Sequence, residues 1–215
     1  MNEQELDLIN KETKKDRIII IIKKNKKKIF FFVFLIIFLV ISFFSYQIYL
    51  SNTKLKIANK YNDAIINYDQ NNKQIIVSEM KEIINKKDKT YSPLALYFLL
   101  DNNLLSSNEE IENYFDILIN ETGLNKNIQN LLIYKKVLFI SDYENEEIIL
   151  KTIDPILKEK NIWTSHALYL LGVYYYENNK KDLSKKYFNK IISLEISNND
   201  LKKEAKKRLQ RDFSD

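Results

Sequence analysis

One segment of the chain is apolar throughout. Residues 29–50 contain no charged residue, no proline and no glycine, and lysines lie on both sides of them. At about 1.5 Å per residue, a helix of this length extends roughly 33 Å, enough to cross a hydrocarbon core of about 30 Å. The pattern therefore predicts one membrane-spanning helix over residues 29–50.

Beyond residue 50, apolar residues recur at helical spacing. Leu168, Leu171 and Tyr175 follow one another at steps of three and four, as on the buried face of a helix. Short polar segments separate such stretches, and Ser107 and Asn199-Asp200 are favourable N-caps. We expect antiparallel helical pairs with helices near residues 53–69, 72–86, 91–104, 107–121, 126–141, 145–158, 163–178, 181–194 and 198–211.

Turn-forming residues are scarce, which changes the choice of fold class. The whole chain holds two glycines and two prolines. Tight turns between strands depend on such residues, so a sheet-rich fold is disfavoured. The predicted fold class is all-α.

An internal repetition indicates which all-α architecture the chain adopts. The segment YSPLALYFL, which begins at Tyr91, returns 72 residues later as WTSHALYLL, which begins at Trp163. This shift is close to two units of the 34-residue tetratricopeptide repeat. The repetition predicts a tetratricopeptide-like α-solenoid of helical hairpins, and the mostly charged helix 198–211 is expected to cap it.

The second copy fits that repeat in detail when Ser165 is taken as position 1. Gly172 then occupies position 8, where it allows the partner helix to approach closely. Tyr175 and Phe188 are expected to fill the space between the two helices. Ser184 stands in place of the usual small alanine, and no proline ends the second helix.

Charge divides the chain into three parts. Residues 1–28 carry nine Lys/Arg against five Asp/Glu, a net charge of +4, whereas residues 51–215 carry only +1. Five lysines, at 23, 24, 26, 27 and 28, directly precede the apolar segment, and the positive-inside rule keeps such a flank cytoplasmic. We therefore predict a cytoplasmic segment over 1–28, a transmembrane helix over 29–50 and a translocated repeat domain over 51–215.

The sequence disfavours two other interpretations of the N-terminal region, a cleaved signal peptide and a nucleic-acid-binding segment. A cleaved signal peptide has an apolar region of about 7–15 residues followed by small residues, whereas this one is longer and ends in Tyr46, Gln47, Ile48, Tyr49 and Leu50. The basic balance belongs to a tail that flanks the membrane, where anionic headgroups are sufficient partners. It does not indicate nucleic-acid binding.

The order and spacing of these features resemble the tetratricopeptide-like periplasmic proteins typified by the ancillary subunit of the SecYEG protein-translocation channel. The resemblance covers nearly the whole chain: the charged N-terminal segment, the single span, a helical-pair domain of this length, TYSPLALYFLL, HALYLLGVYYYENNKKDLSKKYFNKII and a closing helix that ends in KKRL. It implies an inner-membrane protein without catalytic activity that contacts translocon subunits, emerging chains or a periplasmic chaperone.

The sequence contains no motif that indicates a catalytic site or a metal site. His166 is the single histidine and there is no cysteine, so a zinc site or a nucleophilic triad cannot be completed. No glycine-rich loop is present to hold phosphate. Acidic pairs at Glu109-Glu110 and Glu146-Glu147 lie at predicted helix starts, which the helix macrodipole explains. We expect no catalytic residue, no cofactor and no metal.

A surface is the best candidate for function. The inner helix of such a repeat exposes positions 2, 5, 9 and 12, and the 72-residue shift supplies a second set that also includes Asp101. Without Asp101, the predicted partner-binding groove consists of Leu94, Tyr97, Leu104, His166, Tyr169, Val173 and Tyr176. It would favour apolar or helical segments of another protein. Two alternatives stay open: a neighbouring repeat buries these aromatics, and His166 is an ordinary surface histidine.

Two functions fit this organisation. The first is a tethered interaction module that assists export or chaperone handover at the Sec translocon. The second is an anchored scaffold for cell-envelope assembly or cell division, which would use the same repeats on another client. The client itself is not identified by the sequence.

Overall fold

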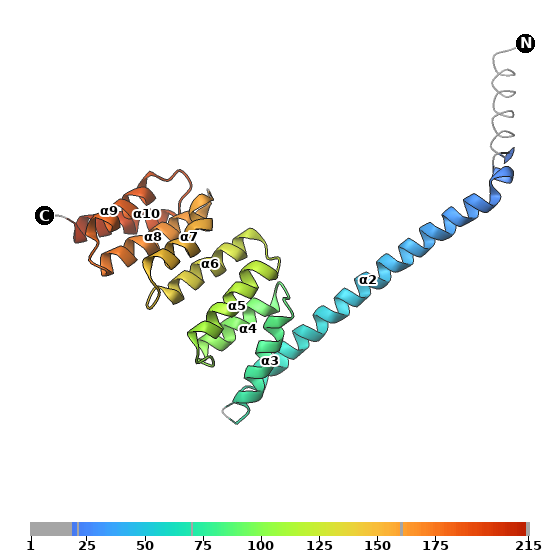
Figure 1. Cartoon of the computed structure of the whole chain (residues 1–215), viewed down its shortest axis with the longest axis horizontal. Coiled ribbons are helices and arrows are strands. Elements are labelled where there is room, and N and C mark those ends of the chain that lie inside the picture. The colour runs from blue at the N-terminus through green and yellow to red at the C-terminus, as the bar shows by residue number, and fades with distance from the viewer. Residues whose placement is uncertain (1–18, 21, 70, 160, 214–215) are drawn as a thin grey trace, which may run out of the picture. The chain divides into compact units, whose positions relative to one another are not determined.

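The computed structural model describes residues 19–20, 22–69, 71–159 and 161–213. The chain divides into two compact units, Met1–Lys56 and Ile57–Asp215. Figure 1 shows the elements in chain order. The division falls inside the long helix α2 (Lys26–Ile66), which therefore contributes to both units.

Helix α2 contains the apolar segment predicted from the sequence. Among the described residues it is the one helix long and apolar enough to cross a membrane. None of the residues in its most apolar stretch is buried within the protein. The sequence thus predicts the candidate span correctly.

The end of α2 differs from the prediction. A separate helix was expected from residue 53, whereas the structure continues α2 without a break to Ile66. No glycine or proline interrupts the helix, and the Thr53 hydroxyl donates a hydrogen bond of 2.9 Å to the carbonyl of Tyr49 one turn earlier. A threonine bonded in this way is compatible with a continuing helix, so the polar segment after Leu50 does not end it.

The second unit is built from helical hairpins. In the order of the chain its helices after α2 are α3 (Lys73–Asn85), α4 (Tyr91–Asp101), α5 (Asn108–Glu121), α6 (Lys126–Ile140), α7 (Glu146–Lys158), α8 (Ile162–Glu177), α9 (Lys181–Ser193) and α10 (Asn199–Asp212). Every one of these lies within three residues of its predicted range. The prediction of an all-α fold with antiparallel hairpins is confirmed.

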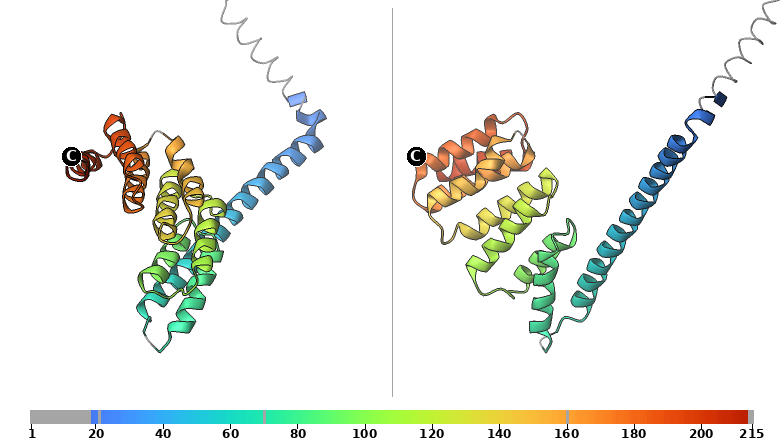
Figure 2. Two further views of the ribbon diagram at one scale, coloured as in Figure 1. Left: turned by 60° about the vertical axis from the view of Figure 1, so that its left-hand side comes forward. Right: turned by 45° about the vertical axis from the view of Figure 1, so that its right-hand side comes forward.

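The helices follow a consistent order of contact. Helix α6 packs against α5, α7 and α8, whereas α5 contacts neither α7 nor α8 in the part of the chain that the structure describes. The two further views of Figure 2 show the same succession of hairpins. At the end of the unit, α9 packs against α8 and α10, so each helix is held mainly by its neighbours along the chain.

Asparagine and serine side chains begin most of these helices. The predicted cap Ser107 accepts a hydrogen bond from the backbone N–H of Glu110 at the start of α5. At the start of α10 the cap is Asn198, one residue before the predicted pair, and its side-chain oxygen accepts the N–H groups of Asp200 and Leu201. Asn198 has the extended backbone that an N-cap requires, so the cap lies one residue before the predicted pair, and the helix itself begins at Asn199, one residue after the predicted start at 198.

The repetition seen in the sequence is also a repetition of burial. The four matched positions Ser92, Ala95, Leu96 and Leu99 are buried in α4, and their counterparts 72 residues later, Thr164, Ala167, Leu168 and Leu171, are buried in α8. The hydroxyl at the first position donates to a carbonyl of the preceding helix in both copies, and that of Thr164 also contacts the carbonyl of Glu159. The Ser92 hydroxyl donates to the carbonyl of Ile83 at 2.6 Å, and the Thr164 hydroxyl donates to the carbonyl of Ile156 at 3.3 Å. Each hydroxyl thereby ties the start of its helix to the preceding helix.

Helices α8 and α9 approach each other closely at Gly172. A Cβ atom added at Gly172 would lie 2.7 Å from Cε1 of Phe188, whose side chain is fully buried. The Ser184 hydroxyl donates a hydrogen bond of 2.7 Å to the carbonyl of Gly172, so the serine that replaces the usual alanine is satisfied. Gly172 therefore has the role predicted from its position in the repeat.

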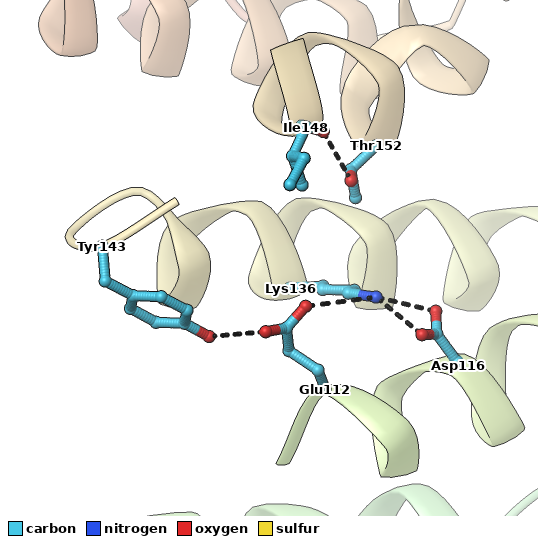
Figure 3. A network of polar contacts seen from close by, with 6 residues as sticks. All are labelled: Glu112, Asp116, Lys136, Tyr143, Ile148 and Thr152. Carbon is cyan, nitrogen blue, oxygen red and sulfur yellow. Dashed lines mark hydrogen bonds and ion pairs between the residues drawn. The ribbon is translucent and has the colours of Figure 1, made fainter. Parts of the chain in front are cut away.

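A polar network joins α5 and α6 (Figure 3). The Lys136 side chain is buried, and its ammonium group donates to both carboxylate oxygens of Asp116 at 2.8 Å. Glu112 lies 3.8 Å from the same ammonium group and accepts a hydrogen bond of 3.1 Å from the Tyr143 hydroxyl. The buried lysine is thus paired with carboxylates from the neighbouring helix, as a buried charge requires.

Candidate functional site

A hollow with apolar and aromatic walls lies between α6 and α8. Its volume is about 360 Å³, near the lower end of the range of roughly 300–1,000 Å³ that ligand pockets occupy. Both helices and the turn that follows α6 contribute to it. The lining residues are Tyr134, Leu138, Ser141, Asp142, Tyr169, Leu170, Val173, Tyr174, Glu177 and Asn178.

The walls of the hollow follow from the helical pattern. On α8, the buried face carries Leu168, Leu171 and Tyr175, so residues Tyr169 and Val173 lie beside that face and one turn apart. The buried face of α6 repeats this pattern 35 residues earlier at Ile133, Lys136 and Ile140. The same shift maps Tyr169 to Tyr134 and Val173 to Leu138. The facing walls are therefore equivalent positions of two successive hairpins.

Aromatic rings extend the wall towards the start of α8. The ring of Tyr134 lies 6.2 Å from that of Trp163 and 6.0 Å, edge to face, from that of His166. The Trp163 and His166 rings are 5.1 Å apart. Burial, followed by the proximity of Tyr169, raises the pKa of the Tyr134 hydroxyl. Tyr134 is therefore neutral at physiological pH.

One end of the hollow is negatively charged. Asp142 and Glu177 line it, both are exposed, and no lysine, arginine or histidine is among the lining residues. Asp142 follows the end of α6 and Glu177 is the last residue of α8. Since the carboxyl end of a helix carries partial negative charge, the two helix ends add to the two carboxylates.

The predicted positions on α8 lie at or beside this hollow, with one exception. Tyr169 and Val173 line it, and His166 belongs to the adjoining aromatic wall. Tyr176 is turned towards the end of the domain, where its ring lies 5.8 Å from that of Phe213 and 5.7 Å from the Arg208 guanidinium. The C-terminal helix thus covers Tyr176.

The predicted positions Leu94 and Tyr97 on α4, and Leu104 shortly after it, form no part of the same surface. Leu94 is 41% exposed, Tyr97 is half-buried and Leu104 is buried. In the described part of the chain α4 contacts α3 and α5 and contacts neither α6 nor α8. The structure therefore does not bring the α4 and α8 positions together into one groove.

Tyr97 is instead held in the core with its hydroxyl buried and unpartnered. Burial, with a smaller contribution from the Asp101 charge, raises its pKa from 10.0 to about 12. We expect Tyr97→Phe to raise the free energy of unfolding by about 1 kcal/mol, because an unpaired buried hydroxyl is removed. Urea unfolding of the full chain in detergent micelles, followed by circular dichroism, measures this change.

The same variant has an expected pH dependence. The folded state favours the neutral phenol, so the wild type loses stability as the pH rises through the interval from 10 to about 12. Tyr97→Phe removes this loss, and its advantage should grow across that interval. A variant that is less stable than the wild type by 1 kcal/mol or more would show that the hydroxyl has a partner in solution.

Eight of the ten lining residues were not among the predicted groove positions: Tyr134, Leu138, Ser141, Asp142, Leu170, Tyr174, Glu177 and Asn178. The 72-residue shift pairs α8 with α4 and passes over α6, which lies between them in the chain. A shift of 35 residues, which maps α8 onto α6, would have pointed to Tyr134 and Leu138. Few residues are identical under this shift, but the buried positions of the two helices match. The two carboxylates lie just outside the aligned core and carry no such signal.

Comparisons with known proteins identify no relative of this chain. No family model matches the chain, and no curated protein or solved structure is significantly similar to it. Within the described residues, no group of three or more histidine, cysteine, aspartate or glutamate side chains could hold a metal ion.

Proposed function

We propose that this protein is a membrane-anchored interaction module without catalytic activity, ancillary to the Sec translocon, which assists export or hands emerging chains to a periplasmic chaperone. The observation that carries the proposal is the aromatic hollow between α6 and α8, with an acidic end, in a domain that follows a candidate membrane span. Tyrosine-rich concave surfaces of this kind suit protein segments.

The proposed architecture of the domain is a tetratricopeptide-like α-solenoid with α10 as its capping helix. Support comes from the burial pattern that α4, α6 and α8 share and from the contact between Gly172 and Phe188. On α10, Ala205 is buried, while Leu201 and Leu209 pack against the same small core. Stacked hairpins of this type expose one face of each inner helix, and in the proposed architecture the hollow belongs to that face.

The proposed location is the cytoplasmic membrane, with a single span, a cytoplasmic N-terminus and residues 51–215 in the periplasm. The lysines before the span and the exposed apolar surface of α2 support it. Anchoring next to the channel raises the effective concentration of the domain near emerging chains, so a modest affinity suffices. An N-terminal apolar helix is also compatible with a signal sequence, which the experiment below distinguishes.

The alternative is an anchored scaffold for cell-envelope assembly or cell division. It would use the same hollow and the same anchor on a different client. The two functions differ in which proteins contact α6 and α8 in the cell.

Site-specific photocrosslinking in cells tests the proposal. A photoreactive phenylalanine analogue in place of Leu138, which is 40% exposed and lines the hollow, should capture channel subunits, emerging chains or a periplasmic chaperone. The same analogue in place of Asn189, an exposed residue of α9, is the matched control and should capture none of them. Mass spectrometry of the full-length adducts identifies the captured proteins and shows whether the N-terminal segment is retained.

Two outcomes would count against this function. Adducts that contain only division or wall-synthesis proteins would favour the scaffold. A reporter active only in the cytosol, fused to the carboxyl terminus, should be inactive; full activity would place the domain on the wrong side of the membrane.

A further inference from the structure

We propose that the hollow between α6 and α8 binds an apolar protein segment that carries a lysine or arginine, with the cation seated at Asp142 and Glu177. This inference rests on the proposed function, because it specifies the chemistry of the segment that the interaction site accepts. It is carried by two unpartnered carboxylates, two helix ends and a set of tyrosine rings.

The carboxylates of Asp142 and Glu177 have no partner within the described residues. Neither makes a salt bridge or a side-chain hydrogen bond, and both are exposed at the hollow. Several other acidic residues of the unit are paired, Glu110 with Lys81, Glu121 with Lys87 and Glu146 with Lys180, while some exposed ones are not. What distinguishes Asp142 and Glu177 is that both line one hollow whose lining contains no basic residue. In a chain with 34 Lys/Arg, this pair of carboxylates is left open to an external cation.

The backbone reinforces this preference for positive charge. Helix α6 ends at Ile140 and helix α8 ends at Glu177, and residues at both ends line the hollow. Carbonyl groups at the carboxyl end of a helix carry partial negative charge and favour a nearby cation. The cation of the bound segment would therefore meet two carboxylates and two helix ends of the same sign.

The walls suit the rest of a lysine or arginine side chain and its apolar neighbours. Leu138 and Val173 offer aliphatic contacts, and Tyr134 and Tyr169 add aromatic side chains to the lining. Long basic side chains pack their methylene groups on apolar surface and place their charge beside aromatic rings. The domain itself does so at Tyr187, whose ring centre lies 5.0 Å from the Lys190 ammonium group.

One basic group that reaches these walls, Arg208, is already paired with a carboxylate. Arg208 of α10 makes a side-chain hydrogen bond to Tyr169, which raises the arginine pKa. Its guanidinium also contacts the Asp212 carboxylate at 2.9 Å, and Arg208 is not among the lining residues of the hollow. Arg208 therefore does not supply the charge that Asp142 and Glu177 lack.

A second hollow makes the same region more acidic. The turn after α6 places Tyr143 and Glu144 in a depression with residues of α5, of about 570 Å³, whose carboxylates are those of Glu109, Glu112, Asp116 and Glu144. Lys136 balances part of this charge. The remaining negative potential would steer a basic segment towards the turn that borders both hollows.

A binding experiment with defined peptides tests the inference. The probe is a terminally blocked octapeptide of leucine, phenylalanine and serine with one central lysine, and two matched peptides carry norleucine or glutamate instead. Titration calorimetry uses the full chain in phosphatidylcholine nanodiscs, with empty nanodiscs subtracted. We expect the lysine peptide to bind about 3- to 10-fold more tightly than the norleucine peptide at low salt, and the difference to shrink at high salt.

Variants locate the effect. The double variant Asp142→Asn, Glu177→Gln should lose the preference for lysine. A control with the same change in charge, Asp63→Asn, Glu195→Gln, alters two exposed acids away from the hollow and should keep it. The inference is overturned if the lysine peptide does not bind, if norleucine binds equally well, or if the preference survives in the first double variant.

The failure of this inference can be told apart from failure of the proposed function. If residue 138 crosslinks to translocon proteins but the lysine peptide shows no advantage, the proposed function stands and the proposed cation specificity fails. A clear lysine preference without such crosslinks would keep the specificity and remove the proposed cellular role.

Discussion

Replacing Lys136 by glutamate is expected to lower the free energy of unfolding by about 3–5 kcal/mol at pH 7. The lysine is only 7% exposed and donates to both carboxylate oxygens of Asp116. Lys136→Glu removes the single cation of this network and adds a third carboxylate beside Asp116 and Glu112, where little water reaches it. Urea unfolding of the full chain in micelles, followed by circular dichroism, measures the loss.

The pH dependence of this variant follows from the same charges. Burial and like charges raise the pKa of the introduced carboxyl in the folded state, so its contribution to stability is retained at low pH and lost as the pH rises. The difference between variant and wild type should therefore be smaller at pH 4 than at pH 8. Lys135→Glu, an exposed change of the same charge on the same helix, is the control and should cost less than about 0.5 kcal/mol.

A neutral replacement separates charge from shape. Lys136→Met keeps most of the apolar side chain, and the Asp116 side chain that it leaves unpaired is 51% exposed. We therefore expect Lys136→Met to change stability by less than about 1 kcal/mol. Equal losses for Lys136→Glu and Lys135→Glu would contradict the assignment of a buried network.

The second large effect is expected at Gly172. Gly172→Val should lower the free energy of unfolding by about 3 kcal/mol, because its Cβ would lie 2.7 Å from Phe188. The Phe188 ring has little freedom to move, since the rings of Tyr169 and Phe213 lie 5.5 Å and 6.3 Å from it. Gly172→Ala should cost less, because the gain of about 1 kcal/mol in helix propensity offsets part of the clash.

A smaller ring should relieve the clash. Phe188→Leu destabilises by itself, but in combination with Gly172→Val it should restore at least about 1 kcal/mol relative to the sum of the two single changes. Asn189→Val, on the exposed face of α9, controls for the helix propensity of valine. Strict additivity of Gly172→Val and Phe188→Leu would mean that the two helices move apart instead of clashing.

The helices could be predicted from the sequence because their signals are local. Apolar spacing and polar separators place α3 to α10 within three residues of their bounds. Gly172 and Phe188 could also be placed, because the repeat pattern fixes which residue faces which. The cap of α10 was predicted one residue too late because Asn198, Asn199 and Asp200 are all capable caps and only the backbone conformation selects Asn198.

The site was less predictable because it depends on contacts between distant segments. Tyr176 follows the same spacing as Tyr169 and Val173, yet Phe213 covers it, and the repeat pattern contains no trace of that contact. Nothing in the sequence around Lys136 indicates that it is buried. Its burial follows from the packing of α5, which places Asp116 beside it. The partner of Tyr169 and Val173 in the hollow is α6, whose resemblance to α8 lies in burial and hardly in residue identity.

The position of Trp163 has a practical consequence. It is the single tryptophan of the chain, and its ring lies 6.2 Å from that of Tyr134, which lines the hollow, and 5.1 Å from that of His166. Indole emission responds to the polarity of its surroundings and is quenched by a protonated imidazole in contact with it. The protein thus carries an intrinsic fluorophore beside its candidate site, and ligand occupancy can be followed optically without attaching a dye.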